Sequence, residues 1–139
     1  MNIEAFFLCD AATDSHGKLN VLGVFDSIVV ASVPATHPQC AVVLRLRLTR
    51  SEQGEHKLSL RLVDADGQNV IQPLEGGFRF AAGQDTSAAT NLILNVQGLR
   101  LPRFGELAFQ LHVDGTHLAS LPVHVRQLPG APRPAPPAN

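Results

Sequence analysis

The first thirty residues are apolar on both faces of a predicted β-hairpin. Residues 4–12 and 19–30 are rich in Phe, Leu, Ile and Val, and the polar segment 14–17, Asp-Ser-His-Gly, separates them. Two β-type runs joined by a short segment with a glycine are typical of a hairpin. Side chains alternate between the faces of a strand, and both sets are apolar here; the even-numbered set includes Phe6, Leu8, Leu22 and Val24. We therefore expect the core to cover one face, and the rest of the chain or a second subunit to cover the other.

The middle of the chain alternates apolar and polar residues with the period of two that a half-buried strand requires. In segments 40–50 and 56–63, Leu and Val alternate with Arg, Lys, Ser and Thr. If the residues between them form a short loop with Gly54 in the left-handed conformation, the segments pair as a hairpin whose leucines share one face. The same register places Arg45 opposite Arg61, a like-charge pair that counter-charges or a bound anion would relieve.

Turn residues divide the flanking segments into further strands. Residues 33–38 contain two prolines and predict a loop that crosses from one sheet to the other. Residues 69–82 are interrupted by Pro73 and by two glycines, which favours an edge strand or a bulge. Residues 86–96 fit a helix or a strand. We favour a strand, because asparagine is a poor helix former and the surroundings are β-type.

The last third of the chain predicts another hairpin and a tail. Residues 104–113 alternate, and Asp114-Gly115 is a strong turn signal. A two-residue turn places His112 opposite His117, and a bulge near Ala119-Ser120 would then restore the alternation of the final strand. From residue 129 the chain is rich in Pro and Ala, so we expect one domain at 1–128 and a disordered tail at 129–139.

Composition narrows the class of protein. The chain has 139 residues, 45% hydrophobic and 17% charged, which fits one globular domain that needs no metal or disulfide. The strand pattern then predicts an all-β antiparallel sandwich of about eight strands. The absence of Trp and Tyr and the net charge of −1 argue against nucleic-acid binding. Without a signal peptide or a membrane-length apolar run, we expect a cytoplasmic protein without stable membrane insertion, in which Cys9 and Cys40 are buried thiols.

Five stretches of the sequence are distributed along nearly all of the chain before the tail. They are FFLCDAATDSHGKLNVLGVFD at 6–26, HPQCAVVLRLRL at 37–48, NLILNVQGL at 91–99, GELAFQLHVDG at 105–115 and SLPVHV at 120–125. In these stretches the sequence resembles a bacterial family of short β-rich proteins known only as a domain of unknown function. The resemblance implies no activity, cofactor or catalytic residue. Separately, the last two strands are similar to those of immunoglobulin-like domains, although the tyrosine expected near the start of the penultimate strand is absent.

Histidines and cysteines offer candidate metal ligands in two places. The groups are His37 and Cys40 with Cys9 or His16, and the pair His112 and His117. The first has the spacing of a zinc half-site, but one mixed half-site and two isolated histidines are both weak signals. A loop histidine beside a buried thiol, and a solvated histidine pair, account for the same residues. We therefore expect no metal and no other cofactor.

Charged residues support an alternative function. Five aspartates near strand ends could gather around calcium, as in a C2-like module that docks on an anionic membrane: Asp10, Asp14, Asp64, Asp66 and Asp114. Ordinary turn chemistry accounts for the same aspartates. Four basic residues could hold a phosphate or an acidic partner, or form a solvated face: Arg45, Arg47, Lys57 and Arg61.

Motifs of catalysis are missing from the sequence. It contains no Gly-x-Ser-x-Gly, no phosphate loop, no dinucleotide fingerprint and no His-Glu-x-x-His. Cys9 and His16 could be drawn as a thiol and a base, but Cys9 lies mid-strand among phenylalanines, where the pKa of a thiol rises. We expect a non-catalytic interaction or structural module that forms a homodimer, with Phe6, Leu8, Leu22 and Val24 as candidate interface residues. The alternative is a calcium- or anion-dependent ligand- or membrane-binding module of the C2-like type.

Overall fold

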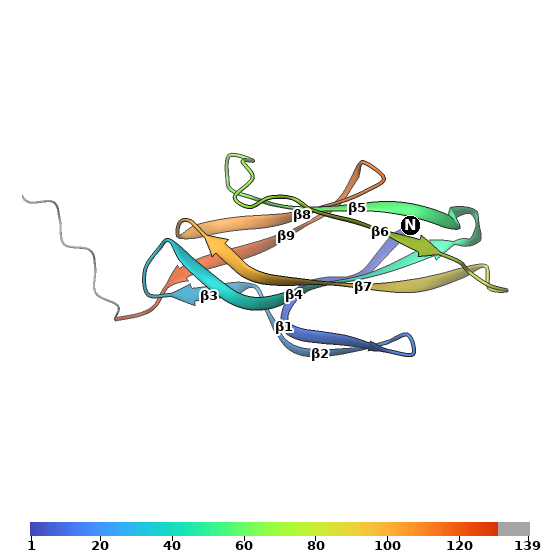
Figure 1. The fold of residues 1–139 in the computed structure, drawn as a ribbon, viewed down its shortest axis with the longest axis horizontal. Coiled ribbons are helices and arrows are strands. Elements are labelled where there is room, and N and C mark those ends of the chain that lie inside the picture. Colours follow the sequence, from blue (N-terminus) through green and yellow to red (C-terminus); the bar gives the residue numbers. More distant parts are fainter. Residues whose placement is uncertain (131–139) are drawn as a thin grey trace, which may run out of the picture.

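Two β-sheets pack face to face in the computed structural model, which describes residues 1–130 (Figure 1). In spatial order, sheet A contains β2 (Lys18–Phe25), β1 (Asn2–Ser15), β4 (Ala35–Thr49) and β7 (Ser87–Leu101). Sheet B contains β3 (Ser27–Val30), β9 (Thr116–Gln127), β8 (Gly105–Val113), β5 (Gly54–Val63) and β6 (Leu74–Phe80). The prediction of an all-β sandwich is confirmed, with nine strands in the described residues and one parallel pair, β3 with β9.

The core lies between the two sheets because alternate residues of each strand point inward. Apolar side chains of β4, β5 and β8 that are at most 7% exposed form its centre: Leu44, Leu46, Leu48, Leu58, Leu60, Leu62, Leu107, Phe109 and Leu111. The leucine rows predicted from the alternation thus do share one core. Among residues 1–130, no helix has the length and apolarity to cross a membrane. Of the expected tail at 129–139, residues 131–139 lie outside the described residues.

The predicted hairpin between segments 40–50 and 56–63 is wrong. A short 3-10 helix, η1 (Arg50–Glu52), carries the chain from β4 in sheet A to β5 in sheet B, so the leucine rows face each other across the core. Arg45 lies opposite Asn91 and Arg61 lies opposite Gln110, not opposite each other. Alternation fixes which side of a strand is apolar, but it does not reveal whether two apolar sides are side by side or face to face.

The apolar run at 19–30 divides between the sheets instead of forming one strand. It ends its pairing in sheet A as β2 and continues in sheet B as β3, with the amide of His124 donating to the Asp26 carbonyl at 2.8 Å where the chain crosses. The following connection returns to sheet A, as the prolines at 33–38 predicted. It is shorter than expected, because β4 begins at Ala35 and includes Pro38.

Residues 10–25, which we call the flap, fold back over the face of sheet A that points away from sheet B (Figure 1). Ala12 and Leu19 of the flap pack with three buried residues of sheet A, Cys9, Ala41 and Val43. At the flap tip, the Asn91 Nδ2 of β7 donates to Asp14 Oδ2 at 2.9 Å and to the Gly17 carbonyl at 3.1 Å. The chain thus covers one apolar face of its opening hairpin by itself.

Gly23 lies in β2, next to Asp10 of β1. Its φ is +69°, a left-handed conformation that side chains with a Cβ adopt at a cost of about 1 kcal/mol. A Cβ on Gly23 would also clash with the carboxylate of Asp10 unless that side chain moved. Both effects favour glycine at this position of β2.

Three local predictions are confirmed. Of the ambiguous segment 86–96, residues 87–96 lie in the strand β7, and β6 is an edge strand that begins directly after Pro73. The last hairpin pairs His112 with His117 and then Leu111 with Ala119, which leaves Leu118 as the extra residue of a bulge. This bulge is one residue from its predicted position, and it restores the inward alternation of β9.

Candidate functional site

The four predicted interface residues separate into two pairs. Leu8 is 1% exposed in the core and Phe6 packs against that core, so these two residues are removed from the candidate interface. Leu22 and Val24 are 70% and 62% exposed on the outer surface of the flap. The even-numbered residues do not share a face, because the turn pairs Leu8 with Phe25 and Leu22 with Ala11. An odd-numbered residue on one strand therefore stands beside an even-numbered one on the other.

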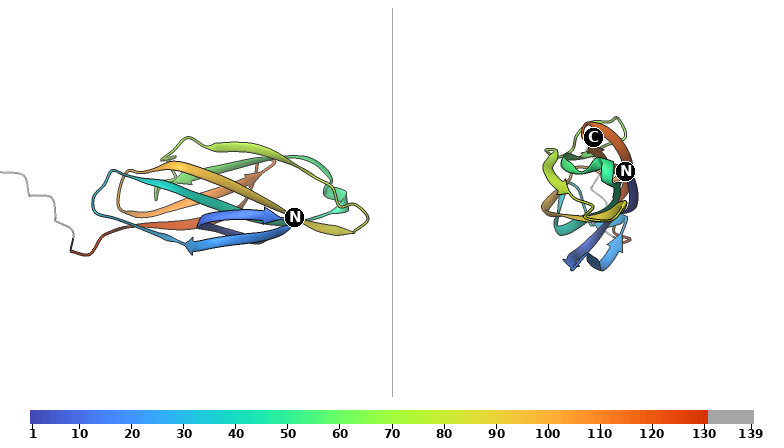
Figure 2. Two further views of the ribbon diagram at one scale, coloured as in Figure 1. Left: turned by 60° about the horizontal axis from the view of Figure 1, so that its bottom comes forward. Right: turned by 90° about the vertical axis from the view of Figure 1, so that its right-hand side faces the viewer.

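The outer surface of the flap adjoins a free sheet edge. Strand β2 is the first strand of sheet A, and within residues 1–130 only β1 pairs with it. Its sole charged residue is Lys18 at its start, whereas exposed edge strands usually carry charges or prolines that prevent pairing with other chains. Viewed end-on in the right panel of Figure 2, the blue flap extends beyond the two sheets on one side. This edge therefore combines accessible backbone with exposed Leu22 and Val24.

The apolar surface continues from the flap to the neighbouring sheet edge. Val29 of β3 is 50% exposed, and it lines a hollow of about 340 Å³ together with Val24. Because β2 and β3 are the edge strands of their sheets and follow each other in the chain, this side of the sandwich exposes Leu22, Val24 and Val29.

The predicted basic face is divided between opposite sides of the sandwich. Arg45 and Arg47 point outward from sheet A, where the Glu4 carboxylate accepts from both at 3.0 and 2.8 Å. The hydrogen bond from Arg47, with a smaller contribution from Arg45, lowers the pKa of Glu4. Lys57 and Arg61 lie on sheet B, so the four residues do not form one anion-binding face.

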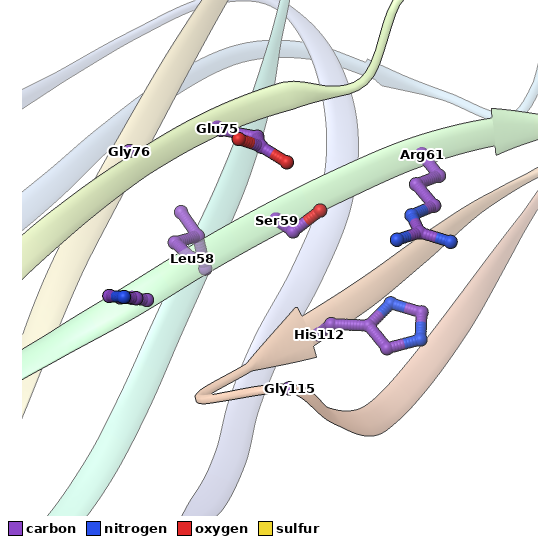
Figure 3. Close-up of a pocket in the computed structure, with 8 residues that line it drawn as sticks. Leu58, Ser59, Arg61, Glu75, Gly76, His112 and Gly115 are labelled. Carbon is purple, nitrogen blue, oxygen red and sulfur yellow. The ribbon is translucent and has the colours of Figure 1, made fainter.

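A hollow of about 460 Å³ lies on the outer face of sheet B (Figure 3). Strands β5, β6 and β8 contribute the polar side chains that line it, Lys57, Ser59, Arg61, Glu75 and His112. Ser59 stands between Glu75 and His112 in one row across the three strands. In Figure 3 the guanidinium of Arg61 lies next to the ring of His112. Alternation produces this face, because every second residue of β5 points away from the core.

The charged groups closest to His112 in this hollow are positive. Burial, with the positive charge of Arg61 and then of His117, lowers the pKa of His112. The rings of His112 and His117 are 5.2 Å apart, as their opposition in the hairpin predicted. Within residues 1–130, the buried atoms Ser59 Oγ and His112 Nδ1 have no hydrogen-bond partner. Both atoms are buried, and a ligand in the hollow can use their hydrogen-bonding capacity once the two side chains rotate toward it.

The candidate metal ligands are not brought together. No group of three or more His, Cys, Asp or Glu side chains suited to a metal occurs in the described residues. Cys9 lies under the flap and Cys40 lies in the core, so the two thiols are on opposite faces of sheet A. Burial raises the pKa of Cys9 and raises that of Cys40 to about 11, which keeps both thiols protonated at neutral pH.

The aspartates are distributed over different parts of the fold. Asp64 is 3.2 Å from Arg103 and accepts from the amides of Asp66 and Gln68, which is turn chemistry near the start of β8. Asp114 follows the opposite end of β8, and Asp14 lies at the flap tip. Aspartates in these separate positions do not form one shared calcium site of the kind that a C2-like module contains.

Sequence reasoning missed an ion pair between β5 and the last hairpin. The His56 Nδ1 lies 2.7 Å from Asp114 Oδ2, its Nε2 lies 2.6 Å from the Glu52 carbonyl, and its ring stacks on Phe78. Both ring nitrogens face acceptors, so the doubly protonated imidazolium satisfies both contacts and the neutral ring satisfies one. The hydrogen bond to Asp114 raises the pKa of His56 and lowers the pKa of Asp114. No sequence spacing indicates this contact, because 58 residues separate the partners.

This pair predicts a pH-dependent stability. The folded-state pKa of His56 is above its usual 6.5, so its contribution is complete below that pH and is lost as the pH rises through the raised value. The contribution of Asp114 is present above its usual 3.8 and is lost as the pH falls through its lowered folded-state pKa. Melting temperatures of the wild type and of His56→Gln should therefore differ most in the mildly acidic range and converge at alkaline pH. An equal difference at every pH would contradict the ion pair.

Comparisons with known proteins place the chain in a family but assign no activity to it. No curated protein sequence matches the chain. Among solved structures, it is similar to the Pseudomonas fluorescens alkylpurine DNA glycosylase AlkC bound to DNA containing an abasic site analogue, at 15% identity and a TM-score of 0.49. That match covers 73% of this chain and only 28% of the glycosylase chain, and it carries no argument about function. A model of the family of unknown function DUF6941 matches residues 4–126. Because this match spans nearly the whole sandwich, the chain belongs to that family.

Proposed function

We propose that the protein is a non-catalytic interaction module that forms a homodimer through the flap and the free edge of β2. The observation that supports this proposal is the exposure of Leu22 and Val24 on an edge strand with one charged residue. An exposed apolar surface beside unpaired strand backbone is the surface that pairing with another strand would bury. The proposal places the module in the cytoplasm, where thiols such as Cys9 and Cys40 remain unpaired.

A second copy of the chain fits this edge better than a partner of different chemistry. Two β2 strands related by a two-fold axis pair antiparallel, so each supplies the backbone groups that the other lacks. Lys18 lies at one end of the strand, which leaves no like charges directly opposite each other at the centre of such a pair. The exposed Leu22 and Val24 of both copies then lie on one continuous surface.

Light scattering coupled to size exclusion tests the homodimer. We expect a dissociation constant on the order of 1 μM, which corresponds to about 8 kcal/mol of binding free energy. The wild type should therefore have the mass of a dimer at about 50 μM, a concentration well above that constant. The double variant Leu22→Lys, Val24→Lys should be a monomer with an unchanged fold, because both side chains are exposed. Phe104→Lys, at a second exposed apolar position away from the flap, should remain a dimer. A strictly monomeric wild type, or a double variant that stays dimeric, would contradict the proposal.

A further inference from the structure

Figure 1 shows sheet B on the other side of the sandwich from the flap. The hollow lies on the outer face of sheet B (Figure 3). We propose that this hollow binds a small phosphate monoester, with the phosphate held between Arg61, Ser59 and His112. The site is separate from the proposed dimer edge, and its occupancy does not depend on dimerisation.

The lining of the hollow supplies hydrogen-bond donors to an oxyanion. Arg61 presents a planar fork of N–H groups that matches two phosphate oxygens, and Lys57 adds a second cation at the rim. Ser59 offers a hydroxyl and His112 offers a ring nitrogen. Both of these atoms are buried and lack partners within the described chain. Buried polar groups are normally hydrogen-bonded, so rotation of these two side chains toward a ligand oxygen in the hollow would satisfy both.

The charges around the hollow favour an anion over a cation. Lys57 and Arg61 on β5 face one carboxylate, Glu75 on β6, and Arg61 forms no ion pair among residues 1–130. Asp114, the next carboxylate, is paired with His56. On β9, His117 lies 3.1 Å from Ser120 Oγ and adds positive charge when protonated. A dianionic phosphate would therefore meet more positive than negative charge, and binding would favour the protonated form of His112.

The size of the hollow favours a phosphate ester over inorganic phosphate. Its volume of about 460 Å³ is within the range of small-molecule sites. Gly76 and Gly115 line it, and a Cβ added to either would meet no atom within 4 Å, so space remains above the backbone beside the polar cluster. The organic part of an ester would occupy this space while the phosphate contacts Arg61.

A titration of the histidine ring resonances by NMR tests the site directly. The probes are glycerol 3-phosphate, inorganic phosphate, glycerol as a neutral control, and sodium chloride at matched ionic strength. Glycerol 3-phosphate should shift the His112 signals and raise the pKa of His112, with a dissociation constant on the order of 1 mM. Inorganic phosphate should do the same more weakly, whereas glycerol and chloride should leave the His112 resonances unchanged.

Variants on the same face separate a specific site from general attraction of anions. Arg61→Gln should weaken glycerol 3-phosphate binding by about tenfold or more, which corresponds to the loss of one charge-assisted contact. Arg79→Gln on β6 removes an equal charge outside the hollow and should leave the affinity within about twofold. Glu75→Gln should tighten binding, because it removes the opposing carboxylate. Equal binding by the two arginine variants, or no change of the His112 signals with either phosphate, would overturn the proposal.

Discussion

Leu8→Lys should prevent the chain from folding. Leu8 is 1% exposed and packs in the core between the sheets, where an ammonium group has neither water nor a carboxylate. Burial of an unpaired charge costs several kcal/mol, which approaches the total free energy of unfolding of about 5–15 kcal/mol for a domain. Circular dichroism should show the loss of the β-sheet signal and of the cooperative thermal transition.

Leu22→Lys is the matched substitution for Leu8→Lys. Both replace a leucine of the opening hairpin by lysine, but Leu22 is 70% exposed, so its replacement should change the free energy of unfolding of the monomer by less than about 0.5 kcal/mol. Denaturant unfolding measures this difference, at a concentration low enough to keep the wild type and Leu22→Lys monomeric. If Leu8→Lys folds normally, or if Leu22→Lys unfolds, the assignment of these two hairpin faces is wrong.

Phe109→Ala should lower the free energy of unfolding by about 3–5 kcal/mol. Phe109 is fully buried on β8, between Leu62 of β5 and Leu121 of β9 in the register of sheet B. Removing the ring leaves a cavity that close-packed neighbours fill only in part. Urea unfolding should show a lower midpoint with an unchanged dependence on denaturant, because the surface exposed on unfolding remains similar.

Phe104→Ala provides the control for this cavity. Phe104 is 36% exposed between β7 and β8, so its truncation leaves no enclosed space and should cost less than about 1 kcal/mol. Equal destabilisation by the two substitutions would contradict the position of Phe109 at the centre of the core.

Alternation of residues was sufficient to predict most of the strands, the inward faces of β4, β5 and β8, and the last hairpin. The leucines of β4 and β5 and the opposition of His112 and His117 follow from a period of two and one strong turn signal. Alternation did not predict the sheet to which a strand belongs. The four residues between β4 and β5, 50–53, are equally compatible with a hairpin loop and with a crossover, and the structure shows that they cross between the sheets through η1.

The predictions of the candidate sites failed where they depended on how distant strands pair. The assignment of Leu8 and Leu22 to one face failed because the turn at His16-Gly17 pairs odd with even positions. The basic face failed because Arg45 and Arg61 lie in different sheets. The hollow around Ser59 depends on β6 and β8 flanking β5, an order that no local pattern specifies. Each of these features brings together residues that are far apart in the chain. It therefore depends on which strands are neighbours and in which register they pair.

Hydrogen exchange of the β2 amides at different protein concentrations tests the proposed assembly most directly. In the monomer, the amides on the outer edge of Lys18–Phe25 have no strand partner within the described chain. The homodimer predicts that these amides exchange slowly at high concentration and quickly on dilution, whereas Leu22→Lys exchanges quickly at both. Exchange in β2 that is independent of concentration in the wild type would contradict the pairing of this edge with a second copy.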